Sequence, residues 1–483
     1  MLRHNPFKKD PSSSFHFAAL LQSCRDSSKQ KVLFVNHHSG GGIERHISEL
    51  AAALGDKIEV VTIRPMDSKR LILRMGTPLQ GAGLRFSLPR HYHELLKLCR
   101  YLRISRVHFH HLMGIHPMIR NLPKDLEIHY DVTLHDFHLI HSNPTLTDQH
   151  GRYCQDVMER DDSCPGWPST PGRLPEAPRC EGRADFLRSA ERVFIPSEFA
   201  ARLFLKHFSD LTPIVTWHPD WENDAPYPNP RPIGLSEETS LRVASIGMLS
   251  REKGVDLFES CAKQAKQRQL PLEFHLIGYA LRPMSRFIKV HGRYEDRELG
   301  RLISEIDPHV IWFPAQWPET YSYTLSAALV SGRPLVVPDI GAFKERVKGR
   351  PFTRVESWDQ PTDQWLKVFL ELRDKMQEFG NRGHERIWAD QHKQNRGFSY
   401  LSDYVVETPY SPEQDTGSFV PNTAWLNPFM CRNPGDVKEM ILRAMMRFIR
   451  FRCVAYLVEL LPYNRRRQIK RYFSRKPVHE IMR

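Results

Sequence analysis

The segment 310–343 constrains the fold more than any other part of the chain. Its letters, VIWFPAQWPETYSYTLSAALVSGRPLVVPDIGAF, predict a buried strand, a polar turn around Glu319, a short helix ending at Gly332 and a second strand over 335–337. In open parallel sheets, ligands bind at the carboxyl ends of the strands. The start of the following helix offers unpaired N–H groups and a positive dipole end, which suit a phosphate or electron-rich sugar oxygens. An ordinary buried βα unit with a surface glutamate fits the same pattern, so this segment alone leaves both interpretations open.

Strands and helices alternate twice along the chain, before and after a segment rich in Pro and Asn at 218–234. That segment cannot continue a helix or a central strand, so it is expected to link two domains. In the first half we expect strands at 31–35, 59–63, 107–110, 128–134 and 192–197, with helices at 43–54 and 198–208. In the second half we expect strands at 241–247 and 273–278, with helices that start at 255 and 296. The alternation predicts two doubly wound α/β domains, and 483 residues are too many for one core.

The predicted boundaries follow from this alternation and from changes in composition. They are an N-terminal extension over 1–30, an N-terminal domain over 31–218, a linker over 219–234, a C-terminal domain over 235–385, a helical run over 386–405, a second linker over 406–435 and a basic amphipathic helical tail over 436–483. The extension contains Ser, Lys and Asp and is expected to be loosely held.

The net charge of +13 is concentrated near the C-terminus. Between Arg443 and Lys476 there are eleven Lys or Arg residues against one acid, Glu459, so this tail supplies ten of the thirteen excess charges. The rest of the chain is close to neutral, and its charge does not predict nucleic-acid binding. No apolar run approaches the roughly 20 residues of a membrane span, the N-terminus has too short an apolar run for a secretory signal, and eight scattered cysteines fit a reducing cytoplasm.

The turn around Glu319 also carries a family resemblance. Pro318-Glu319, a Thr/Tyr/Ser loop, a small-residue helix and Gly332-Arg333-Pro334 resemble the donor-site signature of GT4 glycosyltransferases, most of all those that build bacterial surface polysaccharides. The resemblance implies a GT-B fold, in which two Rossmann-like domains face each other across a cleft and the run 386–405 crosses back onto the N-terminal domain. It also implies that Glu319 contacts the donor sugar, although Ala327 stands where the family has the second carboxylate of its E-x7-E motif. The loop residues expected to bind the donor are Thr320, Tyr321, Ser322, Tyr323 and Thr324.

The stretch 245–254, SIGMLSREKG, resembles the G-x-L-x-x-x-K-G element with which GT4 enzymes hold the diphosphate leaving group. Gly247 and Lys253 match the glycine and the lysine of this element. Met248 occupies the position of the family's arginine, and Arg251 is expected to compensate for it. A helix N-terminal turn with solvated charges is the alternative interpretation of the same letters.

Three further elements match the family more weakly. Gly40-Gly41-Gly42 follows the first strand and resembles the loop that faces the donor phosphates and the acceptor; it is not G-x-G-x-x-G, so a nicotinamide enzyme is not expected. His135 begins a His-Asp pair after a strand, where the family places a histidine against the donor sugar, although most of the 24 histidines are expected to be structural or solvated. Gly292 and Arg293 resemble the loop that reads the nucleotide base.

Two features stand outside this resemblance. His141, Cys154, Cys164 and Cys180 form a His/Cys set without a C-x2-C pair, so four unrelated residues are favoured over structural zinc. The tail over 443–476 interleaves arginine with apolar residues, a pattern of helices that adsorb to anionic membranes. A terminal helix packed on the body, or contact with nucleic acid, would use the same residues.

The resemblance implies a retaining, metal-independent transferase with no cofactor. It is expected in the cytoplasm, where an adsorbing tail would hold it peripherally on the inner face of the plasma membrane. Its substrates would be a nucleotide sugar and a saccharide or lipid-linked acceptor. Glu319, His135 and Lys253 are the expected catalytic residues. A non-catalytic sugar-nucleotide binder is the main alternative, favoured by Met248 and Ala327, and a nucleic-acid-binding protein is the second.

Overall fold

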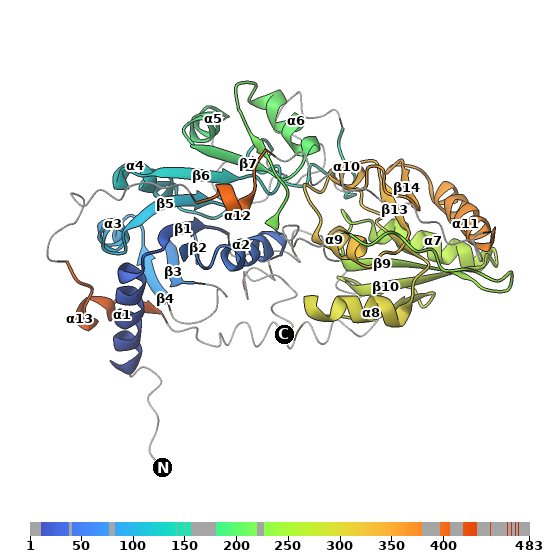
Figure 1. The fold of residues 1–483 in the computed structure, drawn as a ribbon, viewed down its shortest axis with the longest axis horizontal. Coiled ribbons are helices and arrows are strands. Elements are labelled where there is room, and N and C mark those ends of the chain that lie inside the picture. The colour runs from blue at the N-terminus through green and yellow to red at the C-terminus, as the bar shows by residue number, and fades with distance from the viewer. Residues whose placement is uncertain are drawn as a thin grey trace, which may run out of the picture.

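A computed structural model places two α/β domains side by side, each built around its own sheet (Figure 1). The structure describes residues 11–37, 41–76, 83–141, 143–148, 150–155, 180–219, 227–378, 397–405 and 419–431, and the single residues 445, 461, 465, 469 and 472. The predicted architecture of two doubly wound α/β domains is confirmed.

The N-terminal domain has a nine-stranded sheet in the order β15-β4-β3-β2-β1-β5-β6-β7-β8, in which β15 is the two-residue strand Met430–Cys431. Its elements are α1 (Pro11–Asp26), β1 (Gln30–Val35), α2 (Gly42–Ala53), β2 (Ile58–Pro65), β3 (Arg70–Met75), β4 (Gly83–Ser87), α3 (Tyr92–Tyr101), β5 (Ile104–Phe109), η1 (Pro117–Asn121), α4 (Leu122–Leu126), β6 (His129–Thr133), α5 (Cys180–Arg188), β7 (Arg192–Ile195), α6 (Glu198–His207) and β8 (Ile214–Val215). The central strands β2, β1 and β5 to β8 are parallel. The sequences of these strands are nearly continuous apolar runs, because helices cover both faces of a parallel sheet.

The C-terminal domain has a six-stranded parallel sheet in the order β11-β10-β9-β12-β13-β14. Its elements are β9 (Leu241–Leu249), α7 (Val255–Gln267), β10 (Leu272–Ala280), β11 (Ile288–Val290), η4 (Asp296–Glu298), α8 (Leu299–Ile306), β12 (Val310–Trp312), α9 (Tyr323–Val330), β13 (Leu335–Pro338), α10 (Phe343–Arg346), β14 (Thr353–Glu356) and α11 (Thr362–Glu378). The predicted unit over 310–343 is therefore β12, its loop, α9 and β13, at the centre of this sheet.

After the C-terminal domain the chain returns to the N-terminal one. Helix α12 (Tyr400–Asp403) and the adjoining Tyr404 pack against β7, where Tyr400 and Tyr404 lie near Phe194. The Tyr404 hydroxyl lies 2.7 Å from Nδ1 of His108 in β5. Residues 386–396 of the expected crossover run lie outside the described residues.

Two segments differ from the sequence-based expectation. The expected loose N-terminus contains α1, whose Phe17, Leu21 and Cys24 are buried in the N-terminal core. Their spacing of three and four residues gives the helix one apolar face. The sequence analysis did not recognise this helix because the residues around that face are polar. The expected linker over 406–435 contains α13 (Thr423–Leu426) and β15 (Met430–Cys431), which pairs antiparallel with β4.

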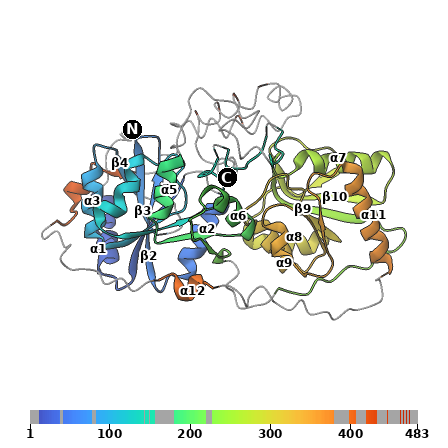
Figure 2. The same cartoon turned by 90° about the horizontal axis from the view of Figure 1, so that it is seen from above.

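The carboxyl ends of both sheets meet where the domains touch (Figure 2). The Thr320 hydroxyl donates to the main-chain oxygen of His135 at 2.6 Å, and Tyr153 N donates to Gln316 O at 2.8 Å. We call the meeting surface around His135 and Thr320 the domain junction.

A carboxylate from α10 also crosses the junction. Glu345 accepts hydrogen bonds from the main-chain N–H groups of Glu198 and Phe199 at the start of α6, both at 3.1 Å. Burial raises the pKa of Glu345 to about 7, although these two donors act in the opposite direction. The Glu345 carboxyl group therefore gains or loses its proton near neutral pH.

Candidate functional site

Lys253 and Glu319 form an ion pair at the carboxyl ends of two adjacent strands. Lys253 lies in the turn after β9, and Glu319 lies in the loop after β12. Their Nζ and Oε1 atoms are 3.2 Å apart, with side-chain exposures of 33% and 9%. The structure thus brings together the two residues of the C-terminal domain that the sequence singled out, and the partly exposed ammonium can turn toward an anion beside the carboxylate.

Two glycines let the backbone close around this pair. Gly254 precedes α7 at φ +80°, and a Cβ there would overlap the carbonyl of Pro314 in the β12 loop. Gly341 lies at φ +62° after β13, and a Cβ there would lie 2.5 Å from Glu319 O and 2.7 Å from Glu319 N. Because Ala342 N also donates to Glu319 O at 2.8 Å, the turn after β13 holds the Glu319 main chain directly.

The loop between Glu319 and α9 is strained and is held by a buried arginine. Ser322 has φ +75° and ψ +92°, a conformation that a non-glycine residue rarely adopts. Arg346, fully buried in α10, donates to Tyr321 O at 2.9 Å, Ser322 O at 2.7 Å and Ser326 Oγ at 2.8 Å. Its guanidinium also lies 3.9 Å from the Tyr321 ring centroid. The sequence analysis did not identify Arg346, because an arginine in a short polar segment predicts a solvent-exposed residue.

On the other side of the junction, His135 belongs to a cluster of buried histidines. Its Nε2 lies 3.4 Å from Nδ1 of His110, and its ring centroid lies 4.8 Å from His46 and 5.2 Å from His218. Burial, reinforced by the neighbouring imidazoles, lowers the pKa of all four rings well below the usual value. These imidazoles are therefore neutral at pH 7. The sequence predicted only His135 of the four; the dense histidines over 108–111 were the available signal for His110.

The glycine loop approaches the Glu319 loop across the junction. Gly40 lies outside the described residues, while Gly41 precedes α2 at φ +83° and Gly42 begins it. A Cβ on Gly42 would lie 3.7 Å from the Tyr323 ring, which Arg45 of α2 covers at 4.4 Å from its centroid. The start of α2 thus faces the start of α9.

The remaining predicted donor-binding residues divide into two groups. Gly247 (φ +104°) lies close to Thr324: a Cβ added at Gly247 would be 3.1 Å from the Thr324 methyl carbon. The Thr324 hydroxyl is 3.2 Å from Ser322 Oγ. Arg293 follows Gly292 (φ +85°) and covers Tyr279, at the end of β10, at 4.4 Å.

Arg251 lies apart from these groups, more than half exposed, and its Nε is 3.7 Å from Asp256 Oδ2. It therefore does not join the Lys253–Glu319 pair in this structure.

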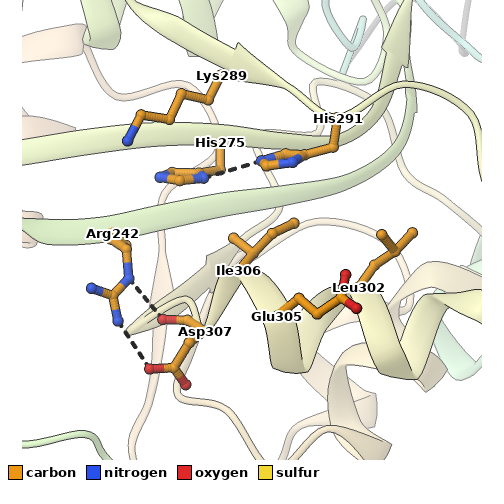
Figure 3. Close-up of a pocket in the computed structure, with 8 residues that line it drawn as sticks. All are labelled: Arg242, His275, Lys289, His291, Leu302, Glu305, Ile306 and Asp307. Atoms are coloured by element: carbon orange, nitrogen blue, oxygen red, sulfur yellow. Dashed lines mark hydrogen bonds and ion pairs between the residues drawn. The ribbon is translucent and has the colours of Figure 1, made fainter.

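A separate pocket of about 600 Å³ lies elsewhere on the C-terminal domain (Figure 3). Arg242 at the start of β9 and Asp307 before β12 both line it, so it opens toward the amino ends of the strands, away from Glu319. His275 and His291 contact each other at 3.1 Å on its wall. None of the predicted site residues lines this pocket.

Two predictions fall wholly or partly outside the described residues. Cys164 and nearly all of the tail over 443–476 lie there, so neither the zinc set nor the membrane contact is tested. Among the residues that the structure describes, the only His/Cys/Asp/Glu group spaced to share a metal ion is His46, His110 and His135, without His141 or Cys154. Within the same residues, no helix is both long and apolar enough to span a bilayer.

No protein family and no curated protein matches this chain in sequence, but solved structures match its fold distantly. HepE from Anabaena, in complex with UDP-glucose, is 12% identical over 72% of this chain and 94% of its own, with a TM-score of 0.43. The pneumococcal O-GlcNAc transferase GtfA, with UDP and GlcNAc, is 10% identical over 73% and 92%, with a TM-score of 0.43. The lipopolysaccharide outer core galactosyltransferase WaaB is 11% identical over 72% and 91%, with a TM-score of 0.45.

Proposed function

We propose that this protein is a glycosyltransferase that moves a sugar from a nucleotide-sugar donor to a saccharide or lipid-linked acceptor. The observation that carries the proposal is the Lys253–Glu319 pair at the carboxyl ends of β9 and β12. Thr320, next to Glu319, contacts the main-chain oxygen of His135 in the other domain. A cation, a carboxylate and a neutral imidazole are the groups needed to hold a diphosphate and the hydroxyls of its sugar. The motif resemblance of 245–254 and 318–334 supports the same conclusion.

Each group has a distinct task in the transfer. The Lys253 ammonium and the N–H groups at the start of α9 stabilise the negative charge that grows on the departing diphosphate. Glu319 accepts hydrogen bonds from sugar hydroxyls, and His135, neutral because it is buried, donates one. Arg346 holds the Tyr321 and Ser322 carbonyls, so that the α9 start is ordered before the donor arrives.

The finer features of the proposal come from the resemblance to GT4 enzymes. The transfer retains the anomeric configuration, an oxygen of the leaving phosphate assists deprotonation of the acceptor hydroxyl, and no catalytic metal takes part. The acceptor belongs to surface polysaccharide synthesis, and the basic tail over 443–476 adsorbs to an anionic membrane that carries a lipid-linked acceptor.

A second candidate is a non-catalytic protein that binds sugar nucleotides. Met248 and Ala327 replace two polar family contacts, and Arg251 pairs with Asp256 instead of compensating at the site. Such a protein would still bind a donor but would not turn it over.

Turnover of a nucleotide-sugar panel separates the two candidates. A donor is first selected by its thermal stabilisation of the protein, since a ligand that binds only the folded state raises Tm. We then expect release of nucleoside diphosphate by the wild type and a loss of about 100-fold or more in Glu319→Ala. The matched control is Lys263→Ala, which breaks another Lys–Glu pair of 3.3 Å in the same domain, on α7. Donor binding without turnover in the wild type would favour the non-catalytic candidate, and no binding by any donor would exclude both.

A further inference from the structure

We propose that His46, His110 and His135 form a binding site for a divalent transition metal, with Zn²⁺ as the expected ion. The three residues come from α2, from the position directly after β5 and from the second position after β6, and all three are buried. They offer one ring nitrogen each, and these nitrogens lie within 4.8 Å of one another. The site lies in the N-terminal domain, at the junction but on the far side of it from Lys253.

The spacing of the ring nitrogens is close to that of a metal-bound set. Two imidazoles on a tetrahedral zinc, with Zn–N bonds of about 2.0–2.1 Å, have their nitrogens roughly 3.3 Å apart. Nδ1 of His110 and Nε2 of His135 are already 3.4 Å apart. The His46 ring centroid lies 5.3 Å from His110 and 4.8 Å from His135, so small side-chain movements complete the triad.

Unpartnered nitrogens give independent evidence that a ligand belongs here. Neither ring nitrogen of His46 has a hydrogen-bond partner in the structure, and the His46 side chain is fully buried. A neutral imidazole carries one N–H donor and one acceptor, and leaving them unsatisfied in the interior costs stability. A metal ion shared among these rings would satisfy their lone pairs.

The chemistry of the site favours zinc over the harder cations. Imidazole nitrogens suit zinc, copper and nickel, whereas calcium and magnesium select oxygen ligands. Three protein ligands leave the fourth position of a tetrahedron for water, as in zinc sites that stay open to ligands.

Metal and donor sugar would then compete for His135, a consequence that rests on the proposed function. An imidazole whose Nε2 binds zinc cannot use that nitrogen for a sugar hydroxyl. Zinc would therefore act as an inhibitor of transfer and not as a catalytic ion, in agreement with the metal-independent reaction. The metal site itself does not depend on this point, because it is tested without any donor.

The test is a titration of chelator-treated, full-length protein with Zn²⁺ in competition with a chromophoric chelator. We expect one tight equivalent in the wild type. His46→Ala and His110→Ala should weaken it by more than the roughly 10–100-fold that follows loss of an outer-shell partner. The matched control is His275→Ala, which disrupts another His–His contact of 3.1 Å, part-buried, in the C-terminal domain; it should retain the tight equivalent.

Two further measurements keep the proposal falsifiable if an alanine variant fails to fold. His46→Gln and His110→Gln retain polar side chains of similar size, and circular dichroism reports whether they fold. In the wild type, Co²⁺ bound at the same site should give the intense visible absorption of a four-coordinate ion. The proposal is overturned if the wild type binds no tight equivalent, or if folded triad variants bind zinc as tightly as the wild type.

Discussion

Gly341→Ala should displace Glu319 without changing any side chain that contacts substrate. Gly341 lies at φ +62°, and an alanine Cβ there would lie 2.5 Å from Glu319 O, 2.7 Å from Glu319 N and 2.8 Å from the Pro318 carbonyl carbon. All three atoms belong to the backbone, so the loop after β12 must move. A shift of roughly 0.5–1 Å is needed to restore ordinary contacts, and a misplacement of about 1 Å at a reacting centre costs about 100-fold in rate.

The cost in stability has two parts, and a neighbouring glycine separates them. Placing an L-residue in the left-handed region costs roughly 1–2 kcal/mol, and overpacking costs about 1–3 kcal/mol more. Gly349 has φ +74° but nothing within 4 Å of a built Cβ, so Gly349→Ala carries only the first cost. Gly341→Ala should therefore be less stable than Gly349→Ala by about 1–3 kcal/mol.

The assay compares both variants with the wild type in thermal unfolding and in donor turnover. A difference of 2 kcal/mol corresponds to a Tm difference of roughly 4–8 °C for a domain of about 150–250 residues. Turnover should fall about 10–100-fold in Gly341→Ala and stay near the wild-type rate in Gly349→Ala. Equal Tm values and equal rates for the two variants would refute the claim that the turn after β13 positions Glu319.

Three other predictions, one of them with a control substitution, test the surrounding structure. Arg346→Lys should destabilise the protein by about 1–3 kcal/mol for each carbonyl left without a donor and should lower donor affinity; thermal unfolding and calorimetric titration check both effects. Asp131→Asn should cost about 3–5 kcal/mol in urea unfolding, because fully buried Asp131 pairs with Arg106 and Arg192, whereas Asp210→Asn, in an exposed pair, should change little. The pKa of Glu345 rises from 4.5 to about 7 on folding, so the folded state binds the extra proton and stability falls as pH rises from 4.5 to 7, by at most about 3 kcal/mol. Glu345→Gln should remove that slope from the pH dependence of Tm; an unchanged slope would contradict the assigned contact.

The central strands of both domains could be predicted because each is a buried apolar run within a regular alternation of strands and helices. β1, β9 and β12 all lie where the pattern places them. The pairing of β15 with β4 could not be predicted, since Met430 and Leu84 are far apart in sequence and β15 has only two residues. Helix α1 was not predicted because its apolar face is narrow and most of the surrounding residues are polar.

Motif spacing located Lys253 and Glu319, but it could not predict side-chain direction. Arg251 stands two residues before Lys253, yet it turns to Asp256 in the first turn of α7. The grouping of His46, His110 and His135 could not be predicted from the sequence either, because the three residues come from separate segments that approach one another only in the folded domain. Arg346 became visible as a positioning residue only through its contacts with the strained Ser322 loop.

Calorimetric titration with the best-stabilising nucleotide sugar, and with its free nucleoside diphosphate, tests the central claim most directly. If Lys253 holds the diphosphate and Glu319 holds the sugar, Lys253→Ala should weaken both ligands by about tenfold or more, at 1.4 kcal/mol per tenfold. Glu319→Gln should weaken the nucleotide sugar while leaving the free diphosphate bound at least as tightly as in the wild type. Unchanged affinity of Lys253→Ala for both ligands would contradict the account.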